Sequence, residues 1–242
     1  MSNNNYFFDL LMLDIETVPQ VQSFDQLSES WQKLFLDKIS KTVPENQSSN
    51  ESYRQKAGIL AEFAKVVCIS TAFFYNDKSG RLCLKLKSIY GDDEVAVITE
   101  FNSLVAKFAE KNRSLKLAGH NIREFDVPFL CRRMLVNQIP LPAAFQLQGA
   151  KPWEINMVDT LQWWKFGDYK NYISLHLLAN VLGIPTSKGD MDGSQVQDVY
   201  YVDRDIKRIV EYCQRDVVVV AQVIQRFKGF PVLPAECIFV AN

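Results

Sequence analysis

Apolar residues follow two different spacings along the chain, and these spacings divide it into expected strands and helices. Residues 6–18, YFFDLLMLDIETV, form a nearly continuous apolar run carrying single carboxylates, which is typical of a strand covered on both faces. We expect this to be the central strand of a sheet, ended by Pro19. Two later runs, 66–75 and 81–90, flank the turn sequence NDKSG and predict a hairpin, so the sheet should be mixed.

Helical spacing of apolar residues marks most of the remaining segments. The first strand leads into a helical excursion over 24–41, and the helix from near Pro128 should turn Phe129, Leu130, Met134 and Leu135 inward. Gly183 and Gly229 are expected to stop the helices that precede them. The other expected elements are a helix over 95–108, a short strand over 115–119, an extended segment over 156–164, and helices over 174–182 and 203–227.

Length and composition favour one α/β domain. The chain has 242 residues, of which 48% are hydrophobic, and no stretch rich in proline, glycine or serine separates two halves. We therefore expect a single domain over 1–242, with a mixed central sheet flanked by helices. Residues 20–65 are longer than a simple connection and predict a helical insertion, and the polar stretch 48–52 is a candidate surface loop or insertion.

Charge and cysteine content limit the classes of function. The formal net charge of −1 gives the chain no overall attraction for nucleic acid, so any such contact must be local. Five scattered cysteines, mostly in apolar runs, indicate reduced core thiols. The polar start MSNNN and the absence of a run of about eighteen apolar residues argue against export and membrane insertion. A cytoplasmic protein is expected.

Two carboxylates occupy alternate positions of the first strand. Asp14 and Glu16 are two residues apart, so both side chains leave on one face while Leu13 and Ile15 point to the other. Burying two carboxylates side by side is costly unless a cation lies between them. An isolated D-x-E is more often the polar edge of a strand, so this pair needs support from elsewhere.

Two further segments provide candidate acidic groups. Tyr212 and Asp216 are four residues apart in the last helix and share one of its faces. Asp126 follows Phe125 where a loop enters a helix. Taken alone, the first pair reads as a core tyrosine beside an exposed aspartate, and Asp126 as an ordinary acidic residue at a helix N-terminus.

In this order, the three segments resemble a known family. Three segments match the exonuclease motifs of the DEDD superfamily, which has the ribonuclease-H-like fold; they are LMLDIETVP, GHNIREFDVPFL and EYCQRD. Their residues look most like those of the proofreading domains of family-B DNA polymerases. The resemblance extends from Leu10 to about Val220. The last motif carries Glu211 where the histidine branch has its histidine, and Tyr212 identifies the tyrosine branch.

The resemblance implies hydrolysis of phosphodiester bonds from the 3′ end by a two-metal mechanism. Two Mg²⁺ or Mn²⁺ ions about 3.5–4 Å apart activate water and neutralise charge on the phosphate oxygens. By resemblance, Asp14 bridges both ions, Glu16 and Asp216 complete the site that carries the attacking water, and Asp126 holds the second ion through water. Tyr212 would orient that water with Glu16, because a tyrosine with a pKa of about 10 is a poor base.

The resemblance also implies residues that contact the substrate. Thr17 and Val18 follow the first motif where the family grips the terminal nucleotide, and Asn121 and Phe125 lie where it lines the 3′ end. Phe125 could stack on a base or belong to the core. His120 is expected to be a structural histidine, Asp159 and Ser174 to have structural roles, and residues 189–193 to form a surface turn. The nearby arginines, expected mostly on solvated helix faces, are Arg123, Arg132, Arg133, Arg204, Arg208 and Arg215.

Three hypotheses about function follow. The residues of the three motifs favour an exonuclease acting on single-stranded or frayed DNA 3′ ends. An RNA-trimming enzyme would have the same fold and carboxylates, and the contact with the 2′-hydroxyl that separates the two cannot be read from the motifs. An inactive nucleic-acid-binding module would be expected to lack a carboxylate, and all four are present. Because the chain ends at Asn242, soon after the third motif, we expect it to act without an attached polymerase module.

Overall fold

A computed structural model describes residues 5–44, 46–151, 154–186 and 191–241. Six strands form one sheet in the order β5-β4-β1-β2-β3-β6, which makes β1 an inner strand, as predicted. The strands are β1 (Leu10–Pro19), β2 (Ala64–Asn76), β3 (Leu82–Tyr90), β4 (Lys116–Gly119), β5 (Met157–Asp159) and β6 (Ile238–Val240). The α-helices are α1 (Asn5–Phe8), α2 (Glu29–Ile39), α3 (Ser49–Lys56), α4 (Glu94–Lys111), α5 (Asp126–Val136), α6 (Thr160–Lys165), α7 (Leu175–Val181), α8 (Val196–Asp198) and α9 (Ile206–Phe227).

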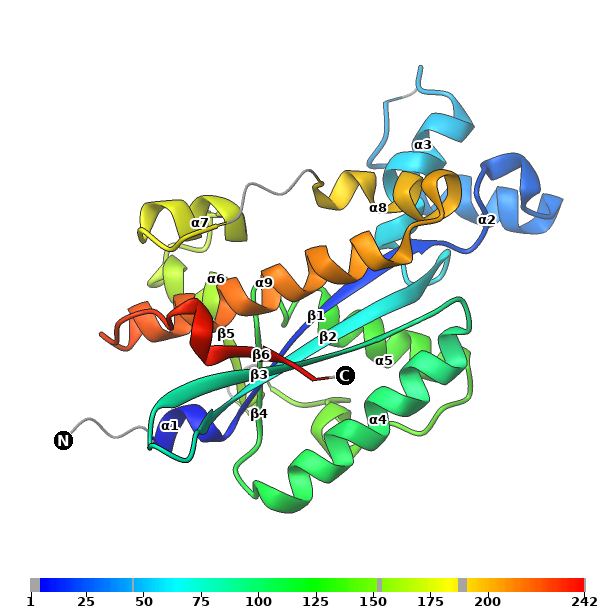
Figure 1. Ribbon diagram of the computed structural model, residues 1–242. Coiled ribbons are helices and arrows are strands. Elements are labelled where there is room, and N and C mark those ends of the chain that lie inside the picture. The colour runs from blue at the N-terminus through cyan, green and yellow to red at the C-terminus, as the bar shows by residue number, and fades with distance from the viewer. Residues whose placement is uncertain (1–4, 45, 152–153, 187–190, 242) are drawn as a thin grey trace.

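The sheet is mixed, which confirms the expectation. β1 pairs antiparallel with β2 and β2 antiparallel with β3, whereas β4, β5 and β6 pair parallel to their neighbours. Helix α9 crosses one face of the sheet, and α4 and α5 cover the other (Figure 1). The alternation of side chains along β1 supplies both layers, because successive residues point to opposite faces.

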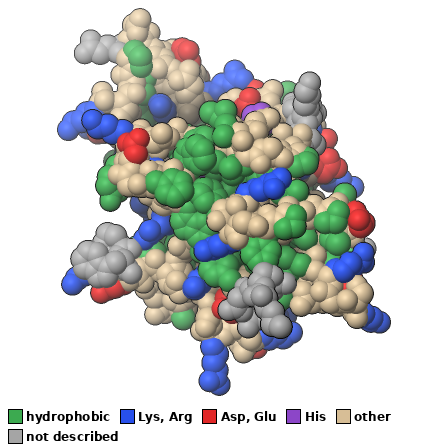
Figure 2. Space-filling model, turned by 90° about the vertical axis from the view of Figure 1, so that its left-hand side faces the viewer, with side chains coloured by type: hydrophobic (Ala, Val, Ile, Leu, Met, Phe, Trp, Pro, Cys, Tyr) green, Lys and Arg blue, Asp and Glu red, His purple; other side chains and the backbone are tan. Residues whose placement is uncertain are grey.

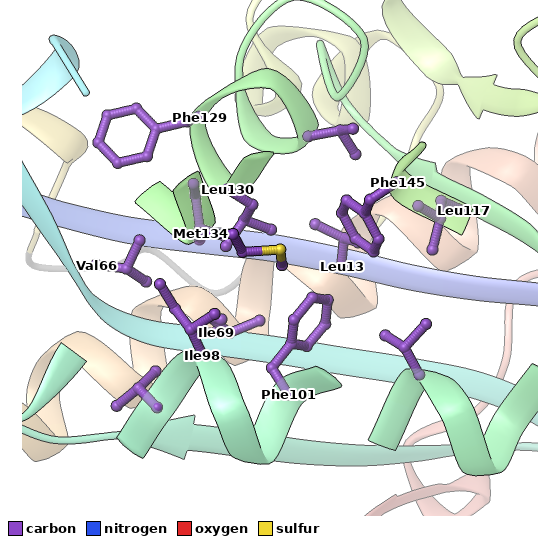
Figure 3. Close-up of a cluster of buried hydrophobic side chains, with 14 of the residues drawn as sticks. Leu13, Val66, Ile69, Ile98, Phe101, Leu117, Phe129, Leu130, Met134 and Phe145 are labelled. Carbon is purple, nitrogen blue, oxygen red and sulfur yellow. The ribbon is translucent and has the colours of Figure 1, made fainter. Parts of the chain in front are cut away.

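The core on the α4 and α5 face is the larger of the two main clusters. Leu11, Leu13 and Ile15 of β1 pack there with Phe101 of α4 and Leu130 of α5. Figure 3 shows Leu13 on β1 with Phe101, Leu130, Met134 and Phe145 gathered around it. Leu10 and Met12 turn the other way, against Val217, Val220 and Ile224 of α9. Both faces of β1 are therefore filled, and the strand is fixed in register.

Several predicted boundaries are wrong. Residues 5–8 form α1 instead of the start of the first strand, and only Met157–Asp159 of segment 156–164 is strand before α6 begins. The predicted last helix begins later, at Ile206, after a π-helical turn over Val199–Asp203. Leu135 is exposed instead of inward-facing, because it lies on the solvent side of α5.

The insertion over 20–65 contains α2 and α3, and its polar stretch 48–52 lies at the start of α3. Ser48 caps α3 by accepting a hydrogen bond from the Glu51 main-chain N–H, at 3.2 Å. α2 and α3 enclose a small aromatic core of their own, in which Phe35 and Tyr53 are 5.1 Å apart between ring centres. Figure 1 shows this insertion beside α8, at the end of the sheet where β1 leaves it.

Candidate active site

β1 carries Asp14 and Glu16 on the face covered by α9. They follow Leu10 and Met12 in the alternation, so their carboxylates point toward α9 while Ile15 enters the opposite core. A bulge between Glu16 and Thr17 shifts the pairing with β2 just after the second carboxylate. Bulges re-aim side chains near functional sites, and this one separates Glu16 from the strand end that follows.

Asp126 begins α5 and reaches back to β1. Its Oδ1 accepts a hydrogen bond from the Ile15 main-chain N–H, at 3.2 Å, and the residue is only 4% exposed. The bond joins the first turn of α5 to the stretch of β1 between the two strand carboxylates. Asp126 is thus an acidic residue at the start of a helix, and it is also a neighbour of Asp14 and Glu16.

α9 brings Tyr212 and Asp216 to the same place. Asp205 caps this helix by accepting from the Arg208 N–H, and Val217, Val220 and Ile224 bury its next turns in the core. The Cys213 thiol, one residue after Tyr212, donates to the Asp14 main-chain oxygen at 3.4 Å. This contact fixes the helix against β1 at the level of the carboxylates.

The four carboxylates affect one another strongly. Burial, followed by the charges of Asp126 and Asp216, raises the pKa of Asp14 well above its ordinary value. Burial and then the charges of Asp14 and Asp216 do the same to the pKa of Glu16. These acids therefore resist ionising together unless a positive charge joins them.

The other two acids show the same effect to a smaller degree. Burial raises the pKa of Asp126 to about 7, although main-chain N–H groups, including that of Ile15, act in the opposite direction. Burial raises the pKa of Asp216 to about 6, with the Tyr212 hydroxyl, Arg215 and His176 opposing it. Asp216 is thus the member of the group best supported by positive partners.

Tyr212 is held in its neutral form. Burial and then the charges of Asp216, Glu16 and Asp14 raise the pKa of its phenol well above the ordinary value. A neutral phenol beside carboxylates can donate a hydrogen bond but cannot take up a proton as a base. The geometry thus supports a positioning role for Tyr212.

The cluster has the features of a cation site. Asp14 Oδ2 is buried without a hydrogen-bond partner among the described residues, and no lysine, arginine or histidine of those ranges forms an ion pair with any of the four acids. Ligand atoms of Asp14, Glu16 and Cys213 lie within 4.8 Å of one another. The Cys213 thiol is a poor ligand for a hard cation, because it donates to a carbonyl and such cations prefer oxygen.

Two clefts reach the carboxylates, one at Glu16 and the other at Asp216. The first, of about 640 Å³, is lined by Glu16, Thr17 and Phe125, by Arg54 and Ile59 from the insertion, and by residues next to α8. The second, of about 630 Å³, is lined by Tyr212, Asp216 and Arg215 of α9 and by Ser174 and His176 at the start of α7. A chain molecule with one bond over the carboxylates would have room on both sides.

The predicted substrate-contacting residues are placed unequally. Thr17 and Phe125 line the first cleft, but the Thr17 hydroxyl already donates to the Gly58 oxygen at 2.6 Å. The Val18 side chain is fully buried, so only its main chain could meet a nucleotide. Asn121 has a positive φ of 60° and a buried Oδ1 without a partner among the described residues, and its side chain lines neither cleft.

His120 and Asp159 have the structural roles expected of them. Both ring nitrogens of His120 are occupied, by the Thr160 hydroxyl and the Ile173 oxygen, each at 2.9 Å. Asp159 accepts from the main-chain N–H groups of Asn121, Arg123 and Leu161, so it caps α6 and holds the loop before α5. Ser174 caps α7, as predicted. Of the expected turn over 189–193, residues 189 and 190 lie outside the described residues, and Asp192 caps the following turn.

Two arginines differ from the prediction of solvated helix faces. Arg133 is 4% exposed and pairs with Glu94, inside the domain. Arg215 points Nη2 into a buried position without a partner among the described residues, at the second cleft. The five cysteines are free, as expected, and four of them are buried. Helices of the described part of the chain are too short or too polar to cross a membrane.

A protein-family model matches residues 59–230, which is most of the chain. Its description reads "Predicted 3'-5' exonuclease related to the exonuclease domain of PolB". The matched stretch contains Asp126, Tyr212 and Asp216 but begins after β1, so Asp14 and Glu16 join the site through the fold instead of through this match.

A solved structure agrees on the fold. The family B DNA polymerase from the hyperthermophilic archaeon Pyrobaculum calidifontis superposes with a TM-score of 0.52 at 16% identity, covering 90% of this chain and 24% of the polymerase. The six-stranded mixed sheet flanked by helices is thus similar to a polymerase exonuclease domain, which confirms the ribonuclease-H-like fold. The chain spans about a quarter of that polymerase's length. No curated protein matches the chain.

Proposed function

We propose that the chain removes nucleotides one at a time from the 3′ end of single-stranded or frayed DNA. The chain belongs to the family of predicted 3′-5′ exonucleases related to the exonuclease domain of PolB, and the proposal follows from this membership. One observation carries the proposal: four carboxylates and a neutral tyrosine from β1, α5 and α9 meet where two clefts open, with Glu16 and Asp126 buried and Asp14 and Asp216 half-buried. Such an arrangement is unstable on its own account and suits a cation-dependent reaction on an anionic substrate.

The residues present fit two hard divalent cations, Mg²⁺ or Mn²⁺. Asp14, Glu16, Asp126 and Asp216 would hold them, because carboxylate oxygens are the ligands that these ions prefer. Asp14 Oδ2, buried without a hydrogen-bond partner in the described ranges, is the oxygen that a cation would stabilise most. When bound, the ions would make water acidic enough to attack near neutral pH and would neutralise charge on the phosphate.

The side chains around the acids would orient the reacting groups. Tyr212, neutral and close to Asp216 and Glu16, would donate a hydrogen bond that fixes the attacking water in line with the phosphorus. Glu16, 7% exposed, would accept from that water on the other side. Arg215, with an unused Nη2 at the second cleft, would meet a phosphate oxygen.

The terminal nucleotide is proposed to lie in the first cleft. Phe125 would contact its base, and Thr17 and Val18 would contribute main-chain groups. Stacking on Phe125 makes no choice among the four bases, which suits an enzyme that trims ends. Arg54 of α3 donates to Asp198 of α8 across this region, so the insertion and α8 together limit its width.

The test is cleavage of a 5′-labelled single-stranded DNA and an RNA of the same sequence, with Mg²⁺, Mn²⁺ or EDTA. The wild-type chain should produce a ladder that shortens from the 3′ end, only with metal. Asp14→Ala should abolish the ladder, and Asp37→Ala, an exposed aspartate of α2, should leave it unchanged. Cleavage that persists in Asp14→Ala or in EDTA would refute the proposal.

The same assay separates the two other hypotheses. Faster shortening of RNA than of DNA would identify an RNA-trimming enzyme on the same site. Inertness on both substrates, with binding retained, would identify a nucleic-acid-binding module without activity.

A further inference from the structure

The loop that joins α6 to α7 exposes three aromatic rings. Phe166, Tyr169 and Tyr172 are 84%, 85% and 69% exposed, the largest such fractions among the exposed large hydrophobic residues of the described chain. Large rings in contact with water stabilise nothing by burial, so their presence together on one loop needs another reason.

Phe166 is costly in a second way. It ends α6 with a φ of +44°, the left-handed conformation that glycine or asparagine normally adopts there, and Gly167 follows with a φ of +91°. A residue with a Cβ has a free-energy cost in this conformation. The Phe166 ring recovers little of it, because its neighbour Phe227 is 6.3 Å away between ring centres.

The loop is nevertheless well ordered. Asp168 Oδ1 accepts from the Lys170 N–H at 3.2 Å, and the Asp168 N–H donates to the Lys165 oxygen at 2.7 Å. At the far end Ile173 is buried and its carbonyl accepts from His120 Nε2. The rings are therefore held outward by a structured turn, and they cost little further ordering when something binds to them.

The position of the loop links it to the candidate active site. Phe166 contacts Phe227 near the end of α9, whereas Ser174 and His176 line the second cleft beside Asp216. Asp216 and Phe227 are eleven residues apart on one helix, or about 16 Å at 1.5 Å per residue. The loop thus runs from the carboxylates outward over the length of about five stacked nucleotides at 3.4 Å each.

Positive charge accompanies the rings. Lys170 lies between Tyr169 and Tyr172 in the loop, and the Lys228 ammonium lies 4.9 Å from the Trp163 ring centre, close to the Phe227 end. Figure 2 views the molecule from the side of α6, α7 and the end of α9, and it shows hydrophobic side chains gathered across the face with Lys and Arg side chains among them. Rings interleaved with cations suit a strand of stacked bases joined by phosphates.

We propose that this loop, residues 166–174, binds the single-stranded nucleic acid upstream of the reacting 3′ end by stacking bases on Phe166, Tyr169 and Tyr172. The inference rests on the proposed function, since it requires the reacting phosphate to lie over the carboxylates. The strand leaves them through the second cleft, where Arg215 meets its first phosphate, and then follows the loop along α9.

The test is a series of 5′-labelled oligothymidylates of 3, 5, 8 and 12 nucleotides. For the wild-type chain kcat/KM should rise with length up to about six nucleotides and then level off. The triple variant Phe166→Gly/Tyr169→Ala/Tyr172→Ala should raise KM on the 12-mer by about 100-fold, because each lost stack weakens binding by roughly fivefold or more. It should match the wild type within about twofold on the 3-mer, with kcat unchanged on both.

Two controls separate binding from structure. Phe239→Ala removes an exposed ring from β6, at the opposite edge of the sheet from β5, and should change neither length dependence nor KM. Phe166→Gly alone should leave the Tm equal or higher, since it relieves the strained backbone, while raising KM on the 12-mer. A fall in Tm with unchanged KM would show that the ring is structural and would overturn the proposal.

The remaining outcomes are also decisive. Length-independent cleavage by the wild-type chain would overturn this inference and leave the proposed function intact. If the wild-type chain cleaves nothing, fluorescence anisotropy of a labelled 12-mer in Ca²⁺ still tests the loop, which should lose affinity in the triple variant. Unchanged affinity together with altered self-association in ultracentrifugation would assign the rings to a protein contact instead, and the proposal would be wrong.

Discussion

Two groups of buried charges share helix α5, and they are resolved in opposite ways. Arg133 and Glu94 form a two-pronged ion pair, with Nε–Oε1 at 2.8 Å and Nη2–Oε2 at 2.6 Å. Glu94 also accepts from Val66 N–H and Asn137 Nδ2, and Arg133 Nη1 donates to the Ala61 oxygen. Seven residues before Arg133, Asp126 belongs to a cluster of four acids that form no ion pair within the described part of the chain.

The two groups differ in whether the chain itself neutralises the charge. The Glu94 and Arg133 group is neutral as a whole, and other groups of the chain supply its hydrogen bonds. It therefore joins α4, α5 and β2 without needing a bound ion. The cluster of Asp14, Glu16, Asp126 and Asp216 contains only acids, has raised pKa values and leaves Asp14 Oδ2 without a partner among the described residues. Such a cluster is typical of a site that binds a cation.

The largest effect is expected from Glu16→Gln, the first of two matched substitutions that test this difference between the two groups. Removing one charge from the cluster should reduce cleavage by about 10³-fold or more, because a cation ligand contributes several kcal/mol to the reaction. It should also raise the Tm of the metal-free protein at pH 7.5, since one repulsive charge is gone. Single-turnover cleavage and thermal melting in EDTA measure the two effects, and a lower metal-free Tm would contradict the comparison.

The same exchange in the other group, Glu94→Gln, should act in the opposite sense. It leaves the Arg133 guanidinium buried without its counter-charge, which typically costs about 3–5 kcal/mol of folding free energy. Urea unfolding measures this cost. The kcat of the fraction that remains folded should be unchanged. Glu94→Gln/Arg133→Met should recover part of the loss, and no recovery would argue against the ion pair as its cause.

Tyr212→Phe sharpens the role of the residue between the acids. Loss of the hydroxyl should lower kcat by roughly 10–100-fold with little change in KM, because the phenol orients the attacking water and does not bind the chain. Steady-state cleavage of a 12-mer checks both constants. A large rise in KM with unchanged kcat would assign the hydroxyl to substrate binding instead.

The smallest expected effect is on the pH dependence of metal-free stability. The native pKa values of Asp126 and Asp216, about 7 and about 6, lie above the value of about 3.9 for aspartate in an unfolded chain. Below about pH 4 both states hold these protons. Between about pH 4 and 7 the unfolded state releases protons that the native state keeps, so stability contributed by these groups falls as pH rises.

Thermal melting in EDTA from pH 4.5 to 7.5 should show this loss, and Asp126→Asn should lose less Tm over the same range. Added Mn²⁺ should raise the Tm more at pH 7.5 than at pH 5, because ionised carboxylates bind it better. An identical pH slope in wild type and Asp126→Asn would show that the raised pKa of Asp126 does not affect stability.

Most of the elements could be predicted because they depend on short spacings, whereas the members of the candidate site were named from the resemblance of three segments to the motifs of a known family. The two-residue step from Asp14 to Glu16 places both on one face of a strand, and the four-residue step from Tyr212 to Asp216 does so on a helix. Helix α3 escaped prediction because its polar residues have no strong apolar period, and its one large buried ring, Tyr53, packs on Phe24 and Phe35 from earlier in the insertion. Arg133 was misplaced because its partner, Glu94, lies 39 residues away.

Side-chain direction follows from local backbone geometry, so the residues that share a face of a strand or helix can be identified from the sequence. Only the tertiary structure decided that β1, α5 and α9 bring their acids within interaction range, that Arg133 is neutralised while Asp14 is not, and that the α6–α7 loop leads away from the second cleft. These outcomes depend on contacts between residues far apart in the chain. Such contacts are fixed by the packing of the two cores around β1, and no local pattern specifies them.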